Sequence, residues 1–288
     1  MAQRFTIIAG GLSDPQNAAD MAPRDWRVDL IPVDGVTPET IAAWRALLIR
    51  SGEQEPHFAD PDYILPAARH QASGRNLVLA LAWGGHARRA ETLHGVVPLV
   101  LPHSIWGARR AALWQPPGLT GQVTHLIEGR YASDVGMALR THLASAHRRL
   151  SLSDLPSGPA KDVGRASLQL IPGRRSPQVR TVPAHNILGI RAKADRTAME
   201  IERISEPGRI RDAVEAFLLL DARTSRKPIV ADPSEAAMVR VVTRLFARRR
   251  QVSVDLAHHR GEIVSGALQL GSGNGSVTWR QAALAGAQ

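Results

Sequence analysis

Residues 43–70 read AWRALLIRSGEQEPHFADPDYILPAARH and carry the strongest fold signal in the chain. Just before them, Thr37 can cap a helix and Pro38 suits its first turn, so a helix is predicted to run into this stretch. Asp60 and Pro61 repeat the same cap-and-proline pattern, and the apolar residues that follow share one helical face. The stretch therefore predicts two helices joined by a turn.

Further strands and helices are predicted outward from this helix pair. Apolar runs predict strands at 76–83, 96–102, 109–117 and 150–156. A turn is expected at 84–95. Apolar residues at helical spacing predict helices at 133–147, 205–223 and 232–250. Alternating apolar residues on either side of a turn predict a hairpin at 252–270, and a further strand is predicted at 277–279. Helices followed by antiparallel strands occur in both halves, which predicts an α+β fold of two tandem units with mostly antiparallel sheets flanked by helices.

Composition sets the expected domain boundaries. Residues 1–25 are rich in Gly, Asp, Pro and Asn, which is typical of a loose leader. Gly, Pro and Arg interrupt the apolar pattern over 157–196, so this stretch is expected to connect the two units and to carry one or two strands. The first unit is then predicted at 26–156 and the second at 197–288.

Bulk properties exclude several classes of protein. The chain of 288 residues is 44% hydrophobic and has no cysteine, which excludes wholesale disorder, disulfides and thiolate chemistry. It has no apolar stretch long enough to span a membrane and no signal-peptide core, so a cytoplasmic location is expected. The net charge of +10 invites a nucleic-acid hypothesis, but the arginines are scattered along the chain. Coding bias or attraction of an anionic small ligand explains the charge at least as well, and nucleic acid is not the expected partner.

Several segments together resemble one family. They are the quoted stretch, VVPLVLP with WGARRAALW, and AFLLLDAR with ADPSEAAMVRVVTRLFARRRQVSVDLAHHRGEIVSGALQL. From about Trp44 to Trp279 the chain resembles the CelD-like branch of the GNAT acyltransferases, which is named for cellulose biosynthesis. These proteins have two GNAT units in tandem, a build similar to the FemAB-type aminoacyl transferases.

The resemblance implies an acyl-CoA-dependent N- or O-acyltransferase in exopolysaccharide or cell-envelope biosynthesis. Acetyl-CoA or another acyl-CoA would be the co-substrate, a small molecule or glycan the acceptor, and no metal is implied. The family holds the pyrophosphate on a loop of the form R/Q-x-x-G-x-G/A. QPPGLT at 115–120 is a near match, which makes Gln115, Gly118 and Thr120 the candidate cofactor residues. A plain turn after a strand is the alternative.

The resemblance also suggests where the acceptor binds. In GNAT units the loop between the first two helices borders the acceptor cleft, so Phe58, Asp60 and Tyr63 are candidate substrate-binding residues, with Trp279 and Arg280 on a late strand. The alternative for the two aromatic residues before and inside the second helix is a hydrophobic staple that anchors the helix entry.

Departures from the family pattern leave a second function open. After the strand at 277–279 the family continues into a further strand, a loop, a helix and a closing strand, whereas here RQAALAGAQ follows. The second unit is thus expected to be truncated, inactive or completed by a partner. The alternative is a catalytically inactive GNAT-like module whose C-terminal sheet a protein partner completes. Candidate general bases near the late strands are Asp221, Asp255 and Glu262.

Overall fold

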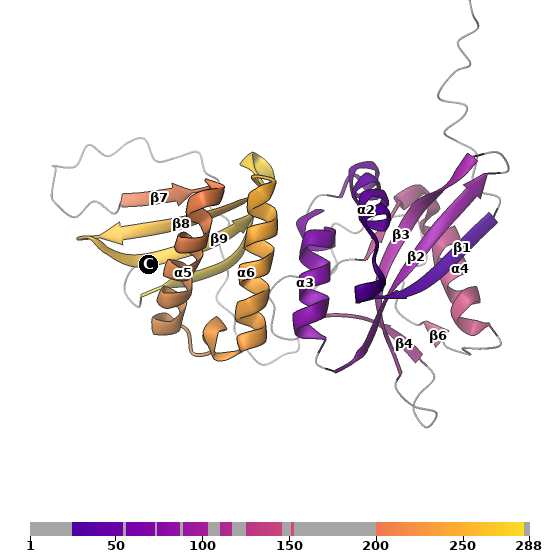
Figure 1. Cartoon of the computed structure of the whole chain (residues 1–288), viewed down its shortest axis with the longest axis horizontal. Coiled ribbons are helices and arrows are strands. Elements are labelled where there is room, and N and C mark those ends of the chain that lie inside the picture. The colour runs from indigo at the N-terminus through magenta and orange to yellow at the C-terminus, as the bar shows by residue number, and fades with distance from the viewer. Residues whose placement is uncertain are drawn as a thin grey trace, which may run out of the picture. The chain divides into compact units, whose positions relative to one another are not determined.

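The chain folds into two compact units, each described here by itself. The computed structural model describes residues 25–53, 56–72, 74–86, 89–102, 110–116, 125–145, 151–152 and 200–284 (Figure 1). Unit 1 holds residues 1–53, 74–115 and 124–158, and unit 2 holds residues 54–73, 116–123 and 159–288. The segment 54–73 therefore packs with the C-terminal part of the chain, whereas the boundaries predicted from the sequence include it in the first unit, at 26–156. The predicted leader up to residue 24 and the connection at 157–196 lie outside the described residues.

Unit 1 is built on one sheet with the strand order β1-β2-β3-β4-β6, and β5 pairs with β3 beside β4. The strands are β1 (Asp25–Pro32), β2 (Asn76–His86), β3 (Arg89–Leu101), β4 (Arg110–Leu113), β5 (Leu126–Ile127) and β6 (Ser151–Leu152). Its helices are α2 (Pro38–Ser51), α4 (Ala132–Ala144) and the 3-10 turns η1 (Val33–Gly35) and η3 (Gly129–Tyr131). All pairings are antiparallel except that of β4 with β6, which α4 connects.

Both faces of this sheet are covered. Helix α4 buries Val135, Leu139 and Leu143 against one face of the sheet, which is formed by every second residue of β1 to β4. The side chains of β2 on the opposite face, which include Leu79 and Leu81, are buried as well. Helix α2 contacts β3 and β5. This explains why the predicted strand at 76–83 is a continuous apolar run although its neighbours are antiparallel.

A β-bulge interrupts the pairing of β2 with β3 at His94. Ala82 pairs with Gly95 and Trp83 pairs with Leu93, so His94 is the extra residue on its strand. A Cβ atom on Gly95 would lie 2.8 Å from Cγ1 of Val135 on α4 and 3.3 Å from Cβ of Ala82. Glycine at this position therefore lets α4 approach the sheet directly beside the bulge.

Unit 2 has a four-stranded antiparallel sheet in the order β10-β9-β8-β7. The strands are β7 (Glu200–Ile204), β8 (Val252–His259), β9 (Glu262–Leu270) and β10 (Val277–Ala283). The helices are α3 (Pro61–Gln71), α5 (Pro207–Thr224), α6 (Pro233–Arg248), η2 (Pro56–Ala59), η5 (Ile229–Ala231) and η6 (Gly273–Gly275). Helices α5 and α6 lie side by side on one face of the sheet (Figure 1), and α3 packs against α6. Phe217 and Phe246 are fully buried in the core of this unit.

The α+β prediction, with two sheets flanked by helices, is confirmed. The capped helices at 37, 60 and 232 begin as expected, with side-chain hydrogen bonds from Thr37, Asp60 and Asp232. The turn expected at 84–95 is wrong, because β2 continues to His86 and β3 begins at Arg89. Glycines 84 and 85 remain in the strand because β1 pairs with them, opposite Trp26 and Asp25.

Substitution of Gly95 by alanine tests the close approach of α4 to the bulge. The added methyl group meets Cγ1 of Val135 on α4 and Cβ of Ala82 on β2, so we expect Gly95→Ala to lower the free energy of unfolding by about 1–3 kcal/mol. Gly85→Ala in the same sheet is the matched control, because its Cβ would make only ordinary contacts at 3.8 Å and 3.9 Å. Urea denaturation of both variants measures the difference, and equal stabilities would contradict the packing described.

Candidate functional site

The substrate-binding residues predicted from the sequence come together in unit 2. The ring of Phe58 meets that of Tyr63 edge-on at 5.2 Å, and the ring of Tyr63 meets that of Trp279 at 5.7 Å. All three side chains are buried, and burial raises the pKa of the Tyr63 hydroxyl to about 12. The two aromatic residues of the turn thus contact each other across the helix entry, as a hydrophobic staple does. A substrate contact for them stays a prediction.

The charged members of the predicted set are held by ion pairs within unit 2. One oxygen of Asp60 accepts the backbone N–H of Asp62 at 2.8 Å, which caps α3. The other oxygen accepts Nη1 of Arg249 at 2.7 Å, at the C-terminal end of α6. Arg280 on β10 pairs with Glu235 near the start of α6. These contacts hold α3, α6 and β10 together. The observed role of the five predicted substrate-binding residues is therefore to connect the elements of unit 2.

The predicted cofactor loop is described only at its start. Gln115 is exposed two residues after the end of β4, and Gly118 and Thr120 lie outside the described residues. The next described element is β5 rather than a helix. A role of this loop in binding coenzyme A therefore stays a prediction.

The candidate bases of the late strands have structural partners or lie on the surface. Asp221 is buried and accepts the backbone N–H of Ile229 at 2.6 Å. Asp255 accepts hydrogen bonds from Arg203 and Gln269, each at 2.7 Å. Glu262 is exposed where the hairpin turns back. Asp255 and Glu262 are not buried, and the buried carboxylate of Asp221 is held by the backbone of η5.

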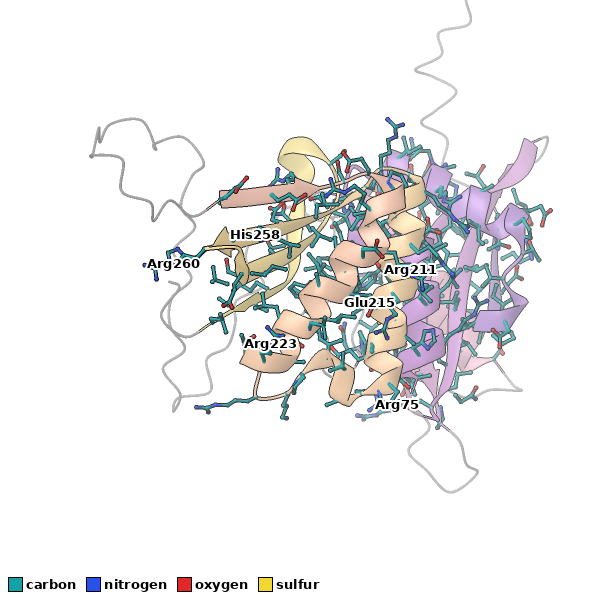
Figure 2. The ribbon with its side chains drawn as sticks, turned by 60° about the vertical axis from the view of Figure 1, so that its left-hand side comes forward. Arg75, Arg211, Glu215, Arg223, His258 and Arg260 are labelled. Atoms are coloured by element: carbon teal, nitrogen blue, oxygen red, sulfur yellow. The ribbon has the colours of Figure 1, made fainter. Side chains whose placement is uncertain are left out.

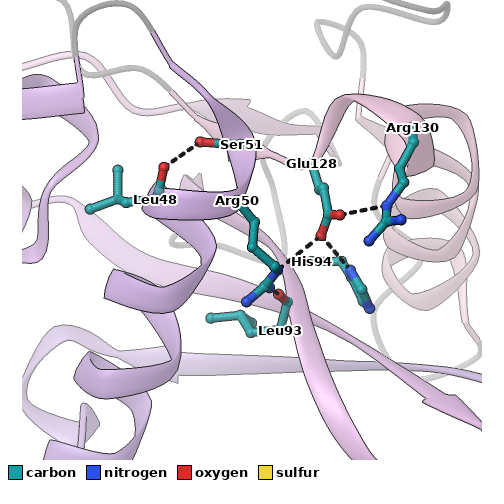
Figure 3. A network of polar contacts seen from close by, with 7 residues as sticks. All are labelled: Leu48, Arg50, Ser51, Leu93, His94, Glu128 and Arg130. Atoms are coloured by element: carbon teal, nitrogen blue, oxygen red, sulfur yellow. Dashed lines mark hydrogen bonds and ion pairs between the residues drawn. The ribbon is translucent and has the colours of Figure 1, made fainter. Parts of the chain in front are cut away.

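Unit 1 holds a buried polar centre that the sequence did not reveal. Glu128 follows β5, and its side chain is 6% exposed. Its Oε2 lies 2.8 Å from Nδ1 of His94 on the bulge of β3, and its Oε1 accepts Nε of Arg130 at 2.6 Å. Arg50 at the end of α2 approaches Oε2 at 3.4 Å and donates from Nη2 to the carbonyl oxygen of Leu93 at 2.6 Å. Figure 3 shows these side chains converging on one carboxylate from α2, β3 and η3.

The charges of this centre follow from its partners. Burial raises the pKa of Glu128, but hydrogen bonds from His94 and Arg130 outweigh burial, so the pKa lies below its usual value. Burial lowers the pKa of His94, and Glu128 offsets this only in part. At neutral pH the carboxylate is therefore ionised and the imidazole neutral. Because an ionised carboxylate only accepts, Nδ1 of His94 must carry the proton, which leaves Nε2 with its lone pair.

The second nitrogen of His94 has no partner within the centre. Nε2 is one of several buried side-chain atoms that have no hydrogen-bond partner among the described residues. The imidazole is enclosed by Tyr131 at 4.7 Å and by Trp26 at 5.5 Å between ring centroids, both edge-on. A buried acceptor without a partner costs free energy, so its presence calls for an explanation, and a catalytic role is one of them. Its arrangement, an oriented imidazole with one bare nitrogen, is that of a general base.

Unit 1 has two open features, the outer edge of β5 and a groove beside Trp26. On the side away from β3, no described strand pairs with β5, and β6 pairs with β4 only at Arg110 and Ala111. Trp26, which contacts His94, also lines a groove of about 390 Å³ between β1 and α4. An extended ligand can therefore pair with the strand edge, and a second ligand has room beside Trp26.

Other kinds of site are not found in the described part of the chain. Within it, no group of three or more His, Asp or Glu side chains is arranged to hold a metal ion. None of its helices combines the length and the apolar character needed to cross a membrane.

The sequence does carry a faint signal of the polar centre. His94 stands inside an otherwise apolar strand directly before a glycine, and Glu128 ends the short apolar pair Leu126-Ile127. A charged residue at the end of a buried strand often has a partner. The pairing itself joins residues 34 positions apart, which no local pattern reports.

Comparisons with known proteins add little to this description. No family model matches the chain, and no curated protein sequence matches it. A solved structure that is similar is a tandem GNAT protein from the clavulanic acid biosynthesis pathway, determined without AcCoA. It is 17% identical, the match covers 91% of this chain and 80% of that chain, and the TM-score is 0.39. A likeness of this size does not place the chain in a family.

Removal of the Glu128 carboxylate tests the centre's role in stability. Glu128→Ala leaves the buried Nδ1–H of His94 without an acceptor and the partly exposed Arg50 and Arg130 without their shared partner, so we expect a loss of about 1–3 kcal/mol in the free energy of unfolding. Glu91→Ala is the matched control, because Glu91 also accepts two hydrogen bonds from one arginine but is 45% exposed. Its loss should stay below about 1 kcal/mol. Equal losses in urea denaturation would contradict the buried network.

Proposed function

We propose that the chain is an acyl-CoA-dependent N- or O-acyltransferase of the GNAT type, with its reaction centre in unit 1. One observation carries this proposal. The imidazole of His94 is neutral, oriented by Glu128 and bare at Nε2, and Glu128 directly follows β5, whose outer edge pairs with no described strand. This combination supplies a base in the same unit as a strand edge to which an extended acyl donor can bind.

The residues present fit a coenzyme A thioester. Its pantetheine arm carries two amide groups, which suit the free edge of β5. Its phosphates suit the N-terminus of α4, where Tyr131 makes no side-chain capping bond and Arg130 is 46% exposed. Glu128 does not repel the phosphates strongly, because Arg50 and Arg130 both lie against its carboxylate.

The chemistry assigned to His94 is removal of one proton. The acceptor's amine or hydroxyl attacks the thioester carbonyl carbon, which forms a C–N or C–O bond and breaks the C–S bond. The acceptor proton passes to Nε2 of His94 and then to the departing thiolate, so the imidazole returns to its neutral form. Glu128 stabilises the imidazolium while it exists and keeps the ring in one orientation.

The acceptor is assigned only by class. The groove beside Trp26 also contains Asp134, Thr141 and Met137, which combines an aromatic face with polar groups. Such a lining suits a glycan or another hydroxyl-rich or amino-bearing small molecule. The role in exopolysaccharide or cell-envelope biosynthesis, which the sequence resemblance implies, is part of the proposal.

A second candidate function is a partner-binding module. Within the described residues β10 pairs only with β9, so one edge of this seven-residue strand carries unpaired backbone groups. A partner strand could complete that sheet by β-augmentation. This candidate gains weight only if the chain does not bind an acyl-CoA.

Thiol release from acetyl-CoA tests the proposed reaction directly. The chain has no cysteine, so a thiol reagent detects only coenzyme A that the reaction frees. With a panel of amino and hydroxyl acceptors, we expect turnover that His94→Gln lowers by about 10²–10⁴-fold. The affinity of the His94→Gln variant for acetyl-CoA in isothermal titration should stay within a few-fold of that of the unaltered chain. His259→Gln in unit 2 is the control and should keep both properties.

The outcomes separate the two candidate functions. Absence of acetyl-CoA binding by the unaltered chain would overturn the acyltransferase and leave the β10 edge as the site to examine. If the His94→Gln variant binds acetyl-CoA and turns it over at the full rate, acyl-CoA remains the co-substrate but His94 is not the base.

A further inference from the structure

A second cavity lies in unit 2, on the outer side of its two long helices. It is a groove of about 640 Å³ between α5 and α6, called here the α5–α6 groove. Four arginines line it, Arg211 from α5 and Arg240, Arg244 and Arg248 from α6. Figure 2 shows Arg211 and Glu215 on α5, with Arg223 at the other end of that helix. Nothing in the acyl-transfer proposal uses this groove.

The arginines form a regular row. The three on α6 are spaced four residues apart, which places successive side chains on one helix face about 6 Å apart along the axis. Arg211 reaches the groove from α5. Helix α5 begins at Pro207, which also lines the groove, so the positive end of its dipole adds to the same field.

Most of this positive charge is not neutralised inside the groove. Glu215 is the one acidic residue in its lining, and it accepts Nε and Nη2 of Arg240 at 2.6 Å and 2.8 Å. The hydrogen bond from Arg240 and the charge of Arg211 lower the pKa of Glu215. No hydrogen bond or ion pair joins Arg244 or Arg248 to another described residue. The lining therefore keeps an excess of three positive charges.

The floor of the groove selects among anions. It is apolar, with Ile210, Val214 and Val241, and no aromatic ring is in the lining. A single-stranded nucleic acid binds through base stacking on aromatic side chains together with a basic groove, and this groove offers only the second feature. Its volume lies in the range typical of small-molecule sites.

We propose that the α5–α6 groove binds a soluble phosphorylated small molecule with at least two negative charges. Its phosphate or diphosphate would be held by Arg211, Arg244 and Arg248, with Arg240 fixed in place by Glu215. Its uncharged part would lie on the apolar floor. Arginine suits this task because its planar guanidinium forms paired, charge-assisted hydrogen bonds to phosphate oxygens.

Isothermal titration of the full chain with ADP and with inorganic pyrophosphate tests the site. The double variant Arg244→Ala, Arg248→Ala should bind ADP at least about ten-fold more weakly, since each lost charge-assisted bond weakens binding by about that factor. Arg223→Ala, Arg226→Ala is the matched control, which removes the same charge from exposed positions of the same unit. It should change the affinity by less than about two-fold.

Further arms distinguish the sources of the phosphate and the two proposals. A single-stranded oligonucleotide and vesicles of phosphatidylglycerol with phosphatidylcholine are titrated in parallel. The small-molecule proposal would be overturned if the oligonucleotide or the vesicles bind, the groove variant loses this binding, and ADP does not bind. Absence of ADP and pyrophosphate binding, or equal weakening in the control variant, would overturn it too. The groove variant should release coenzyme A thiol from acetyl-CoA as fast as the unaltered chain, so failure of the groove proposal leaves the acyltransferase proposal untouched.

Discussion

The buried carboxylate of Glu128 is the constraint on which the polar centre of unit 1 depends. A carboxylate at 6% exposure must be met by hydrogen-bond donors, and here they come from the end of α2, the bulge of β3 and the turn before α4. The bulge delivers His94, and the glycine beside it lets α4 come close enough to begin at the same place. The same contacts that satisfy the charge also leave one imidazole nitrogen bare, and this links the packing of the unit to the proposed acyl transfer.

Unit 2 depends on a different charge pair, between Asp60 and Arg249. Asp60 serves both as the cap of α3 and as the partner of an arginine 189 positions later. Together with the ring contacts of Tyr63, this pair places a helix from the first third of the chain in the C-terminal unit. On α6, Arg244 and Arg248 have no partner among the described residues, so the anionic ligand is proposed for the groove that they line and not for the buried aromatic cluster.

Local patterns predicted the regular elements well and the tertiary relations poorly. The caps at Thr37, Asp60 and Asp232 and the hairpin at 252–270 report backbone chemistry within a few residues, and all of them are found. The turn expected at 84–95 fails because pairing with β1, not side-chain hydrophobicity, keeps the glycines in the strand. The substrate residues chosen by resemblance do gather in space, yet all of them except Arg280 are buried. His94 and Glu128 were missed because their significance lies in a pairing between distant residues, and Gly118 and Thr120 lie outside the described part of the chain.

The protonation state of His94 tests the central claim most directly. Nitrogen-15 NMR of the imidazole distinguishes its two neutral tautomers and its charged form, and His94→Gln identifies the signal. The account predicts a neutral ring with the proton on Nδ1 at pH 7, and a pKa below the usual value of about 6.5. A proton on Nε2 at neutral pH, or an imidazolium that persists above pH 7, would contradict it.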